Sequence, residues 1–116
     1  MRKNLIVILG PTASGKTTLA VRLAAEFGGE VISADSRQVY RGMNIGTGKD
    51  LDQYIIDGRK INYHMIDVAD PDEEFSLFDY QRDFYEIFIN LTRKKVLPIM
   101  VGGTGLYLEA VLAAYD

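Results

Sequence analysis

The sequence contains no cysteine and only one histidine. Without cysteine, the 116-residue chain can form neither a disulfide bond nor a thiolate metal site, and a cytoplasmic setting fits this composition. The histidine, His64, lies within a predicted strand and is accompanied by neither a second histidine nor an HExxH pattern, so we interpret it as structural. These absences exclude disulfide scaffolds and cysteine-based metal sites.

Long apolar runs are also missing from the chain. No run approaches the ~18 residues needed to cross a bilayer, and residues 1–5 lead directly into a strand pattern, so we expect neither a membrane span nor a signal peptide. Hydrophobic residues make up 47% of the chain and charged residues 25%, as in soluble globular proteins. The length allows one domain, residues 1–116, which we expect to be monomeric. The net charge of −3 disfavours a general nucleic-acid coat but is compatible with a local basic patch.

A stretch near the amino terminus has the pattern of a nucleotide-binding P-loop, Gly-x-x-x-x-Gly-Lys-Ser/Thr. Its residues are Gly10, Pro11, Thr12, Ala13, Ser14, Gly15, Lys16 and Thr17. Glycine lets backbone N–H groups surround an anion, and the following helix adds its unpaired N–H groups and the positive end of its dipole. Lys16 would contact outer phosphate oxygens, and the Thr17 hydroxyl would bind Mg²⁺. The motif predicts a ligand with linked phosphates, without deciding between ATP, GTP and another diphosphate.

Four apolar segments have the pattern of strands: residues 5–9, 30–33, 62–66 and 99–101. Pro98 stands at the edge of the last segment, where a missing N–H is tolerated. The connections between the strands are long enough for parallel pairing. The sequence therefore predicts an α/β protein, a three-layer P-loop NTPase-like fold with a parallel sheet. Residues 41–60 are the least regular part, with a short helix predicted over residues 50–56.

Apolar residues at the spacing of a helix follow the P-loop, and two further helices are predicted later in the chain. In the first helix one face carries Leu19, Ala20, Leu23, Ala24 and Phe27, and Gly28 ends it. The second begins with Ser76 and Asp79 as a capping pair, with Phe75 and Tyr80 placed as a hydrophobic staple. Its apolar positions are typical of a core rather than of a base-stacking platform: Leu77, Tyr80, Phe84, Ile87, Phe88 and Leu91. A glycine-rich turn at residues 102–105 opens a third helix over residues 106–114.

Polar side chains follow the ends of these predicted strands. Because the carboxyl ends of parallel strands share one edge, we expect the P-loop, residues 35–38, Asp67 and residues 102–105 to converge there. Asp35 could hold Mg²⁺ or accept a proton from a nucleophile, although a capping or loop role would also explain it. Asp67 is a second candidate for organising the metal and could equally serve a turn. Arg37 and Gln38 suit contacts with a base or a phosphate.

Four segments of the chain resemble the tRNA dimethylallyltransferases, also called tRNA isopentenyltransferases. They are GPTASGKTTLA from Gly10, ISADSRQVYRGMNIGTGK from Ile32, HMIDVADPDEEFS from His64 and PIMVGGTGLYLEAVL from Pro98. The first is shared with many kinases and NTPases, whereas the second and fourth in this order are highly specific. The resemblance covers nearly the whole chain but only the amino-terminal part of the family's pattern.

The resemblance implies transfer of a dimethylallyl group from dimethylallyl pyrophosphate to N6 of the adenosine 3′ of the anticodon, tRNA position 37. It implies that the P-loop grips the pyrophosphate, with Mg²⁺ as cofactor, and that the partner is a tRNA anticodon stem-loop. It identifies Asp35 as the catalytic aspartate and places a second catalytic and tRNA-contacting residue at Thr104. The remaining tRNA-binding run that it implies is Asp35, Ser36, Arg37 and Gln38.

The sequence departs from the family pattern in small ways and in length. Tyr63 stands where many members have histidine, and Gly48 where many have alanine. Family members continue past Asp116 with another arginine-bearing segment and a helical insertion that grips the anticodon arm. We therefore expect the chain to be an amino-terminal fragment, with little or no turnover by itself.

Two other functions fit part of the pattern. A small-molecule or nucleotide kinase would share the P-loop and Mg²⁺, and Asp67 could serve it as well, but the pairing of DSRQVY with GGTGLY argues against it. An inactive fragment that only binds diphosphate is the other alternative.

Overall fold

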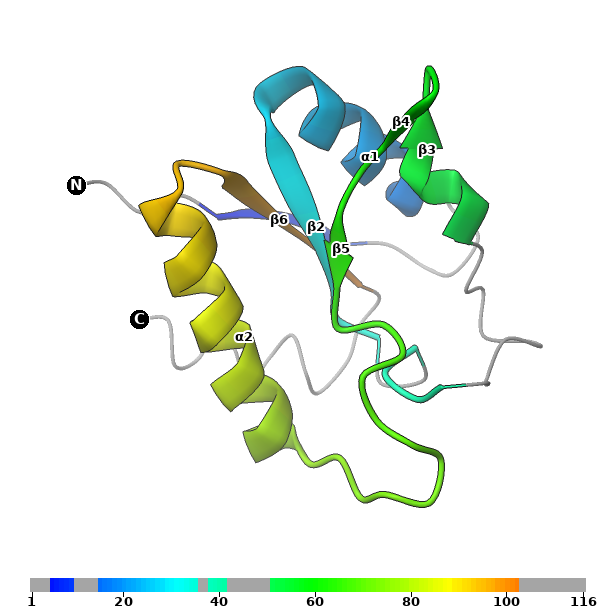
Figure 1. The fold of residues 1–116 in the computed structure, drawn as a ribbon, viewed down its shortest axis with the longest axis vertical. Helices are drawn as coiled ribbons and strands as arrows, with labels where there is room; N and C mark the ends of the chain where they lie inside the picture. Colours follow the sequence, from blue (N-terminus) through cyan, green and yellow to red (C-terminus); the bar gives the residue numbers. More distant parts are fainter. Residues whose placement is uncertain (1–4, 10–14, 36–37, 42–50, 103–116) are drawn as a thin grey trace.

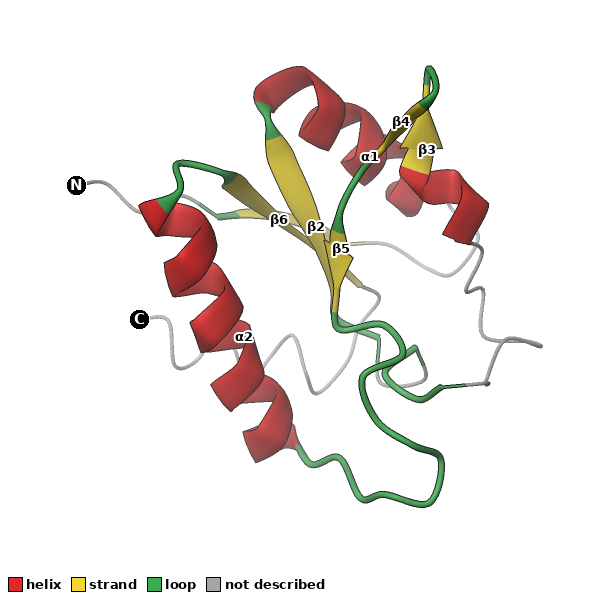
Figure 2. Ribbon diagram, viewed as in Figure 1, coloured by secondary structure: helices red, strands yellow, loops and turns green. Residues whose placement is uncertain are grey.

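A four-stranded parallel sheet forms the centre of the protein in the computed structural model, which describes residues 5–9, 15–35, 38–41 and 51–102. The strands are β1 (Ile6–Leu9), β2 (Gly29–Ser33), β5 (Tyr63–His64) and β6 (Leu97–Gly102). Their order across the sheet is β1-β6-β2-β5, and each neighbouring pair is parallel. Figure 1 shows the four strands running in one direction, and Figure 2 shows the helices on either side of them. The predicted α/β class and parallel sheet are confirmed.

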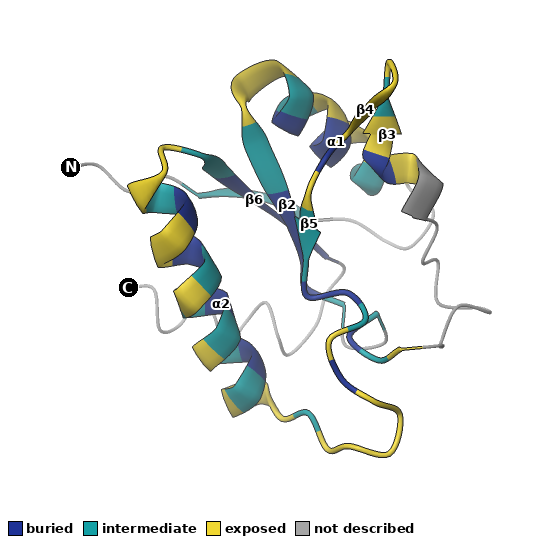
Figure 3. Ribbon diagram, viewed as in Figure 1, coloured by how far each residue is buried: buried dark blue, intermediate teal, exposed yellow. Residues whose placement is uncertain are grey.

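Two helices cover opposite faces of the sheet and complete the three layers. They are α1 (Lys16–Phe27) and α2 (Leu77–Arg93). Because successive side chains of a strand point to opposite faces, Val31 belongs to the core beneath α1 and Ile32 to the core beneath α2. The same alternation separates Ile99 from Met100 on β6. Figure 3 shows the buried residues concentrated on the central strands and on the inner sides of the helices.

The α1 helix ends as predicted, and its buried face includes the predicted Ala20 and Ala24 but not all of the predicted positions. Gly28 takes a left-handed conformation (φ 67°), and its N–H donates to the Ala24 carbonyl. The buried residues are Ala20, Val21 and Ala24, whereas Leu19 and Phe27 are 50% and 59% exposed. The prediction that Leu19 and Phe27 belong to the buried face is therefore wrong. Small side chains allow α1 to approach the sheet closely, and this leaves the larger ones at the margins of the contact.

The α2 helix follows the prediction closely. Ser76 and Asp79 form a reciprocal capping box, in which the Ser76 hydroxyl accepts from the Asp79 N–H at 3.1 Å. The Ser76 N–H and hydroxyl in turn donate to the Asp79 carboxylate at 2.9 and 3.0 Å, and these two bonds hold the pKa of Asp79 below its usual value. Phe75 packs against the cluster that contains Tyr80, as expected for a hydrophobic staple. Four predicted core positions are buried, Tyr80, Phe84, Phe88 and Leu91, while Leu77 is exposed.

The segment between β2 and α2 differs most from the prediction. The predicted helix over 50–56 is a 3₁₀ turn, η1 (Leu51–Tyr54), followed by a hairpin of β3 (Ile55–Ile56) and β4 (Arg59–Lys60). Asp57 and Gly58 both have positive φ, the Asp-Gly pattern of a tight hairpin turn. The predicted strand over 62–66 is cut to two residues because Met65 and Asp67 also adopt positive φ, which takes the chain out of the extended conformation.

Pro98 lies inside a central strand, since β6 begins one residue before it and runs between β1 and β2. The Leu97 N–H donates toward β2, to the Gly28 carbonyl, so the nitrogen of Pro98 faces the β1 side. Pairing with β1 begins only at Ile6 and Ile99. Among the described residues, the missing N–H of Pro98 therefore removes no bond of the sheet.

In the part of the chain that the structure describes, no helix is long and apolar enough to cross a bilayer.

Candidate active site

Because the four strands are parallel, their carboxyl ends lie at one edge of the sheet, which for β2, β5 and β6 is the lower edge in Figure 1. The predicted P-loop follows β1, Asp35 follows β2, Asp67 follows β5, and β6 ends at Gly102. The described strand ends therefore lie at one edge of the sheet, which is where the predicted site segments begin. Thr104, Ser36 and Arg37 lie outside the described residues, as do residues 10–14 of the P-loop and the helix predicted over 106–114.

The described end of the P-loop has the geometry of an anion-binding helix start. Gly15 occupies the N-cap position of α1 with φ 80°, a conformation that strains any residue with a Cβ. Since glycine has no side chain, it leaves the first N–H groups of the helix without a side-chain cap. Lys16 and Thr17 form the first turn and are partly buried. This arrangement suits a phosphate or pyrophosphate group at the helix N-terminus.

The segment after β2 is tied to the strand end by a compact set of hydrogen bonds. The Ser33 hydroxyl donates to the Gln38 amide oxygen at 2.8 Å and accepts from the Asp35 N–H at 3.4 Å. The Gln38 N–H donates to the Asp35 carbonyl at 3.1 Å. Two predicted site residues, Asp35 and Gln38, are therefore brought together around Ser33.

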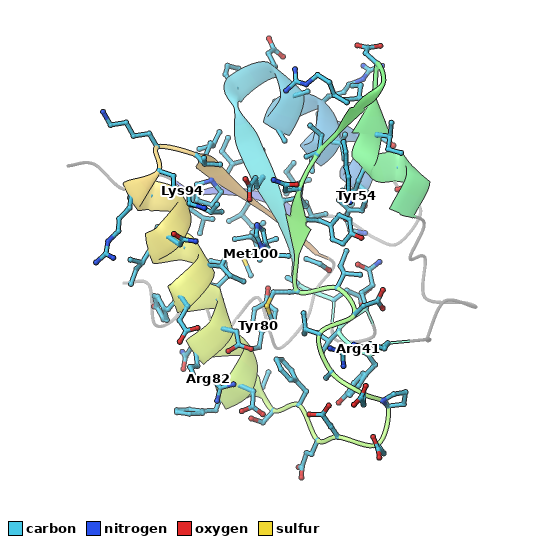
Figure 4. The ribbon with its side chains drawn as sticks, in the orientation of Figure 1. Arg41, Tyr54, Tyr80, Arg82, Lys94 and Met100 are labelled. Carbon is cyan, nitrogen blue, oxygen red and sulfur yellow. The ribbon has the colours of Figure 1, made fainter. Side chains whose placement is uncertain are left out.

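Two residues that the sequence analysis did not single out support this strand end. Ser33 is only 3% exposed, and the Tyr80 hydroxyl, contributed by α2, donates to the Ser33 carbonyl at 2.6 Å. Figure 4 shows Tyr80 in the space between α2 and the sheet. At Gly102 of β6, an added Cβ would lie 2.9 Å from the Cβ of Ala34, so the two strand ends approach closely. In the sequence, Tyr80 has the spacing of an ordinary core residue, and nothing in that pattern indicates the role of its hydroxyl.

Asp67 lies directly beside this segment. Its N–H donates to the Gln38 carbonyl at 2.9 Å, and its φ of 58° belongs to a turn. The chain continues alongside residues 39–41, where Tyr40 forms a bridge with Ala69. The backbone of Asp67 thus serves a turn, while its carboxylate stays a candidate for organising a metal ion.

His64 pairs with a carboxylate instead of joining a metal cluster. Its Nε2 lies 2.7 Å from Glu30 Oε1, a contact between β5 and β2. Asn62 donates to the other oxygen of Glu30 at 3.2 Å. These contacts agree with a structural role for His64. Among the described residues, no group of three or more histidine or acidic side chains is placed to hold a metal.

Two family models match the chain. The model for IPP transferase matches residues 38–116, and the model for isopentenyl transferase matches residues 3–69. The chain belongs to the IPP transferase family. The match includes the strand end around Gln38 and the second glycine-rich turn, so the predicted resemblance is confirmed.

Individual relatives agree with this membership. A protein of Syntrophus aciditrophicus (strain SB) named tRNA dimethylallyltransferase 1 is 64% identical over 115 residues, 99% of this chain and 38% of that protein. The full-length tRNA isopentenylpyrophosphate transferase of Bacillus halodurans has a TM-score of 0.88 at 43% identity, covering 99% of this chain and 37% of its own. A eukaryotic dimethylallyltransferase acting on tRNA has a TM-score of 0.84 at 35% identity, over 94% of this chain and 26% of that one. The chain therefore has the family's fold and spans less than two-fifths of the length of these relatives.

Proposed function

We propose that the complete polypeptide containing these residues transfers a dimethylallyl group from dimethylallyl pyrophosphate to a tRNA. The acceptor is N6 of the adenosine immediately 3′ of the anticodon, tRNA position 37. The observation that carries the proposal is membership of the IPP transferase family together with 64% identity to a tRNA dimethylallyltransferase. The convergence of the P-loop end and Asp35 at one sheet edge supports it, because the reaction needs a pyrophosphate holder beside a group that handles a proton.

The P-loop would bind the pyrophosphate of the donor. Positive groups at the start of α1, including Lys16, would stabilise the negative charge that grows on the departing pyrophosphate as its bond to the prenyl carbon breaks. The Thr17 hydroxyl would hold Mg²⁺ together with phosphate oxygens and water, the oxygen-rich set that this ion prefers. Bound Mg²⁺ would supply further charge stabilisation for the leaving group. A role of this kind requires no ATP hydrolysis.

Asp35 would act on the other reactant. The adenine N6 forms a bond to the prenyl carbon while the carbon–oxygen bond to pyrophosphate breaks, and the amine loses a proton. The Asp35 carboxylate would orient the amine and accept that proton. Contacts with the RNA would come from Ser36, Arg37 and Gln38 on the same segment, and from Thr104 after β6.

The adenine would have to leave its stack to enter this edge of the protein. Such unstacking costs a few kcal/mol, which contacts with the flipped base and the neighbouring nucleotides must offset. A tRNA anticodon loop is a suitable substrate because its bases are not held in a continuous duplex.

The test uses the complete polypeptide, isotopically labelled dimethylallyl pyrophosphate and an anticodon stem-loop. We expect one label per RNA, on N6 of the adenosine 3′ of the anticodon, located by nucleoside mass spectrometry. A matched RNA with guanosine at that position should receive none. Transfer of phosphate from ATP to a small molecule, without prenyl transfer, would instead support the kinase alternative. Unchanged donor affinity after Lys16→Ala would contradict the assignment of the P-loop to the pyrophosphate.

A further inference from the structure

We propose that Ser33 and Tyr80 are positioning residues that hold Asp35 and Gln38 in the orientation needed to receive the tRNA. The inference rests on the proposed function and adds two residues to it. Neither side chain is assigned a contact with substrate. They act through the strand end that carries Asp35 and Gln38.

The last carbonyl of β2, that of Ser33, requires a hydrogen-bond donor from outside the sheet. The Val31 N–H donates to the Asn62 carbonyl on the β5 side, and the backbone groups of a strand alternate in direction, so the Ser33 carbonyl also faces β5. The register of β2 with β5 ends at Ile32 and His64, because the chain turns at Met65. The Ser33 carbonyl is therefore directed past the end of β5, into the region covered by α2.

The Tyr80 hydroxyl supplies the donor that the sheet does not provide. Its oxygen lies 2.6 Å from the Ser33 carbonyl oxygen, and Tyr80 is fully buried. A buried carbonyl without a partner is costly, and a hydrogen bond in a low-dielectric interior is strong. Since the Tyr80 ring packs in the core cluster beneath α2 and stacks near Phe84, this bond joins the end of β2 to the aromatic core of that layer.

The Ser33 side chain extends the support from the strand to the segment beyond it. Its hydroxyl donates to the Gln38 amide oxygen and accepts from the Asp35 N–H, so one buried oxygen joins both ends of residues 35–38. These bonds fix the orientation of the Gln38 amide and the backbone direction at Asp35. The path from α2 to the proposed tRNA-contacting run thus passes through Tyr80 and Ser33.

The test compares Tyr80→Phe and Ser33→Ala with wild type in the complete polypeptide, using the stem-loop assay. Each variant removes one hydroxyl, and Thr92→Val is the matched control: Thr92 lies at the other end of α2, where its hydroxyl donates to the Phe88 carbonyl at 2.8 Å. We expect kcat/KM for the RNA to fall about ten-fold in both test variants, the equivalent of one lost hydrogen bond, and to stay within about two-fold of wild type in the control. The fall should include a higher KM for RNA, with KM for the prenyl donor unchanged. A merely unfolded fraction would lower kcat and leave both KM values as they were.

A double-mutant cycle separates positioning from general destabilisation. In a Gln38→Ala background, Ser33→Ala should add less than about two-fold to the loss, because its main partner is already gone. Full additivity, or an unchanged KM for RNA in the single variants, would overturn the inference while leaving the proposed function intact. Absence of prenyl transfer in the wild-type protein would overturn both.

Discussion

The two helices contribute to the candidate site in different ways. The α1 helix supplies it directly, since its amino-terminal turn carries Lys16 and Thr17 behind the left-handed Gly15. The α2 helix supports it indirectly, through an aromatic core and the bond from Tyr80 to the end of β2. The buried side chains that α1 contributes are small, those of Ala20, Val21 and Ala24, whereas those of α2 are mostly aromatic, with Tyr80, Phe84 and Phe88. The helix that would bind phosphate in the proposed function thus contacts the sheet through small side chains, whereas the helix that supports the Asp35 strand end contributes bulky rings and a buried hydroxyl.

The largest effect on stability should come from the aromatic face. Phe84 is fully buried and its ring lies 5.9 Å from that of Phe88, so Phe84→Ala would leave a cavity between α2 and the sheet. We expect a loss of about 3–5 kcal/mol in the free energy of unfolding, measured by urea denaturation. Phe78→Ala is the matched control, because Phe78 is 70% exposed on the same helix and should change stability by less than about 0.5 kcal/mol. Equal losses in the two variants would contradict the assignment of this face as the main core.

The alanine face should respond to added volume. Ala24 is 1% exposed and lies in the cluster with Val31 and Ile99, so Ala24→Leu would overpack the contact between α1 and the sheet. We expect a loss of about 1–3 kcal/mol in the same denaturation experiment. Leu19→Ala, on the exposed side of α1, should cost much less. A stabilising effect of Ala24→Leu would mean that α1 can move away from the sheet without penalty.

The smallest expected effect is at the start of α2. Ser76→Ala removes one half of the capping box and should cost about 1 kcal/mol. The folded-state pKa of Asp79 is lowered below its usual value of 3.8, so the stability that its carboxylate contributes is present above that pH and is lost as the pH falls below it. The difference in urea midpoint between wild type and Asp79→Asn should therefore shrink below pH 3.8. A difference that persists unchanged in strong acid would show that the charge of Asp79 is not involved.

Sequence patterns predicted the elements that depend on local chemistry. The capping pair and the wide apolar face of α2 are local signals, and both are present in the structure. On α1, the prediction was right for Ala20 and Ala24 and wrong for Leu19 and Phe27, because this helix contacts the sheet mainly through small side chains. The short β5 could not be anticipated from an apolar run, because Met65 takes a left-handed conformation that its residue type does not favour.

The parts of the candidate site that follow from the order and direction of the strands were predicted from the sequence. Parallel strands bring their ends to one edge, and this placed Asp35 and Asp67 near each other from the chain order alone. The roles of Ser33 and Tyr80 depend on a contact between residues 47 positions apart, which no local pattern contains. Asp57-Gly58 is a sequence pattern typical of a two-residue hairpin turn, and it indicates the hairpin at residues 55–60; the prediction of a helix there did not take it into account.

The central claim is that Asp35 acts on the adenine amine at an edge where the P-loop holds the prenyl donor. The most direct test is single-turnover transfer from labelled dimethylallyl pyrophosphate to the anticodon stem-loop, comparing wild type with Asp35→Asn in the complete polypeptide. Asp72→Asn, on an exposed turn, is the matched control. We predict a loss of at least about 100-fold in the transfer rate for Asp35→Asn, as for removal of a general base, with unchanged donor binding and a control rate equal to wild type. Transfer by Asp35→Asn at the wild-type rate would contradict the account.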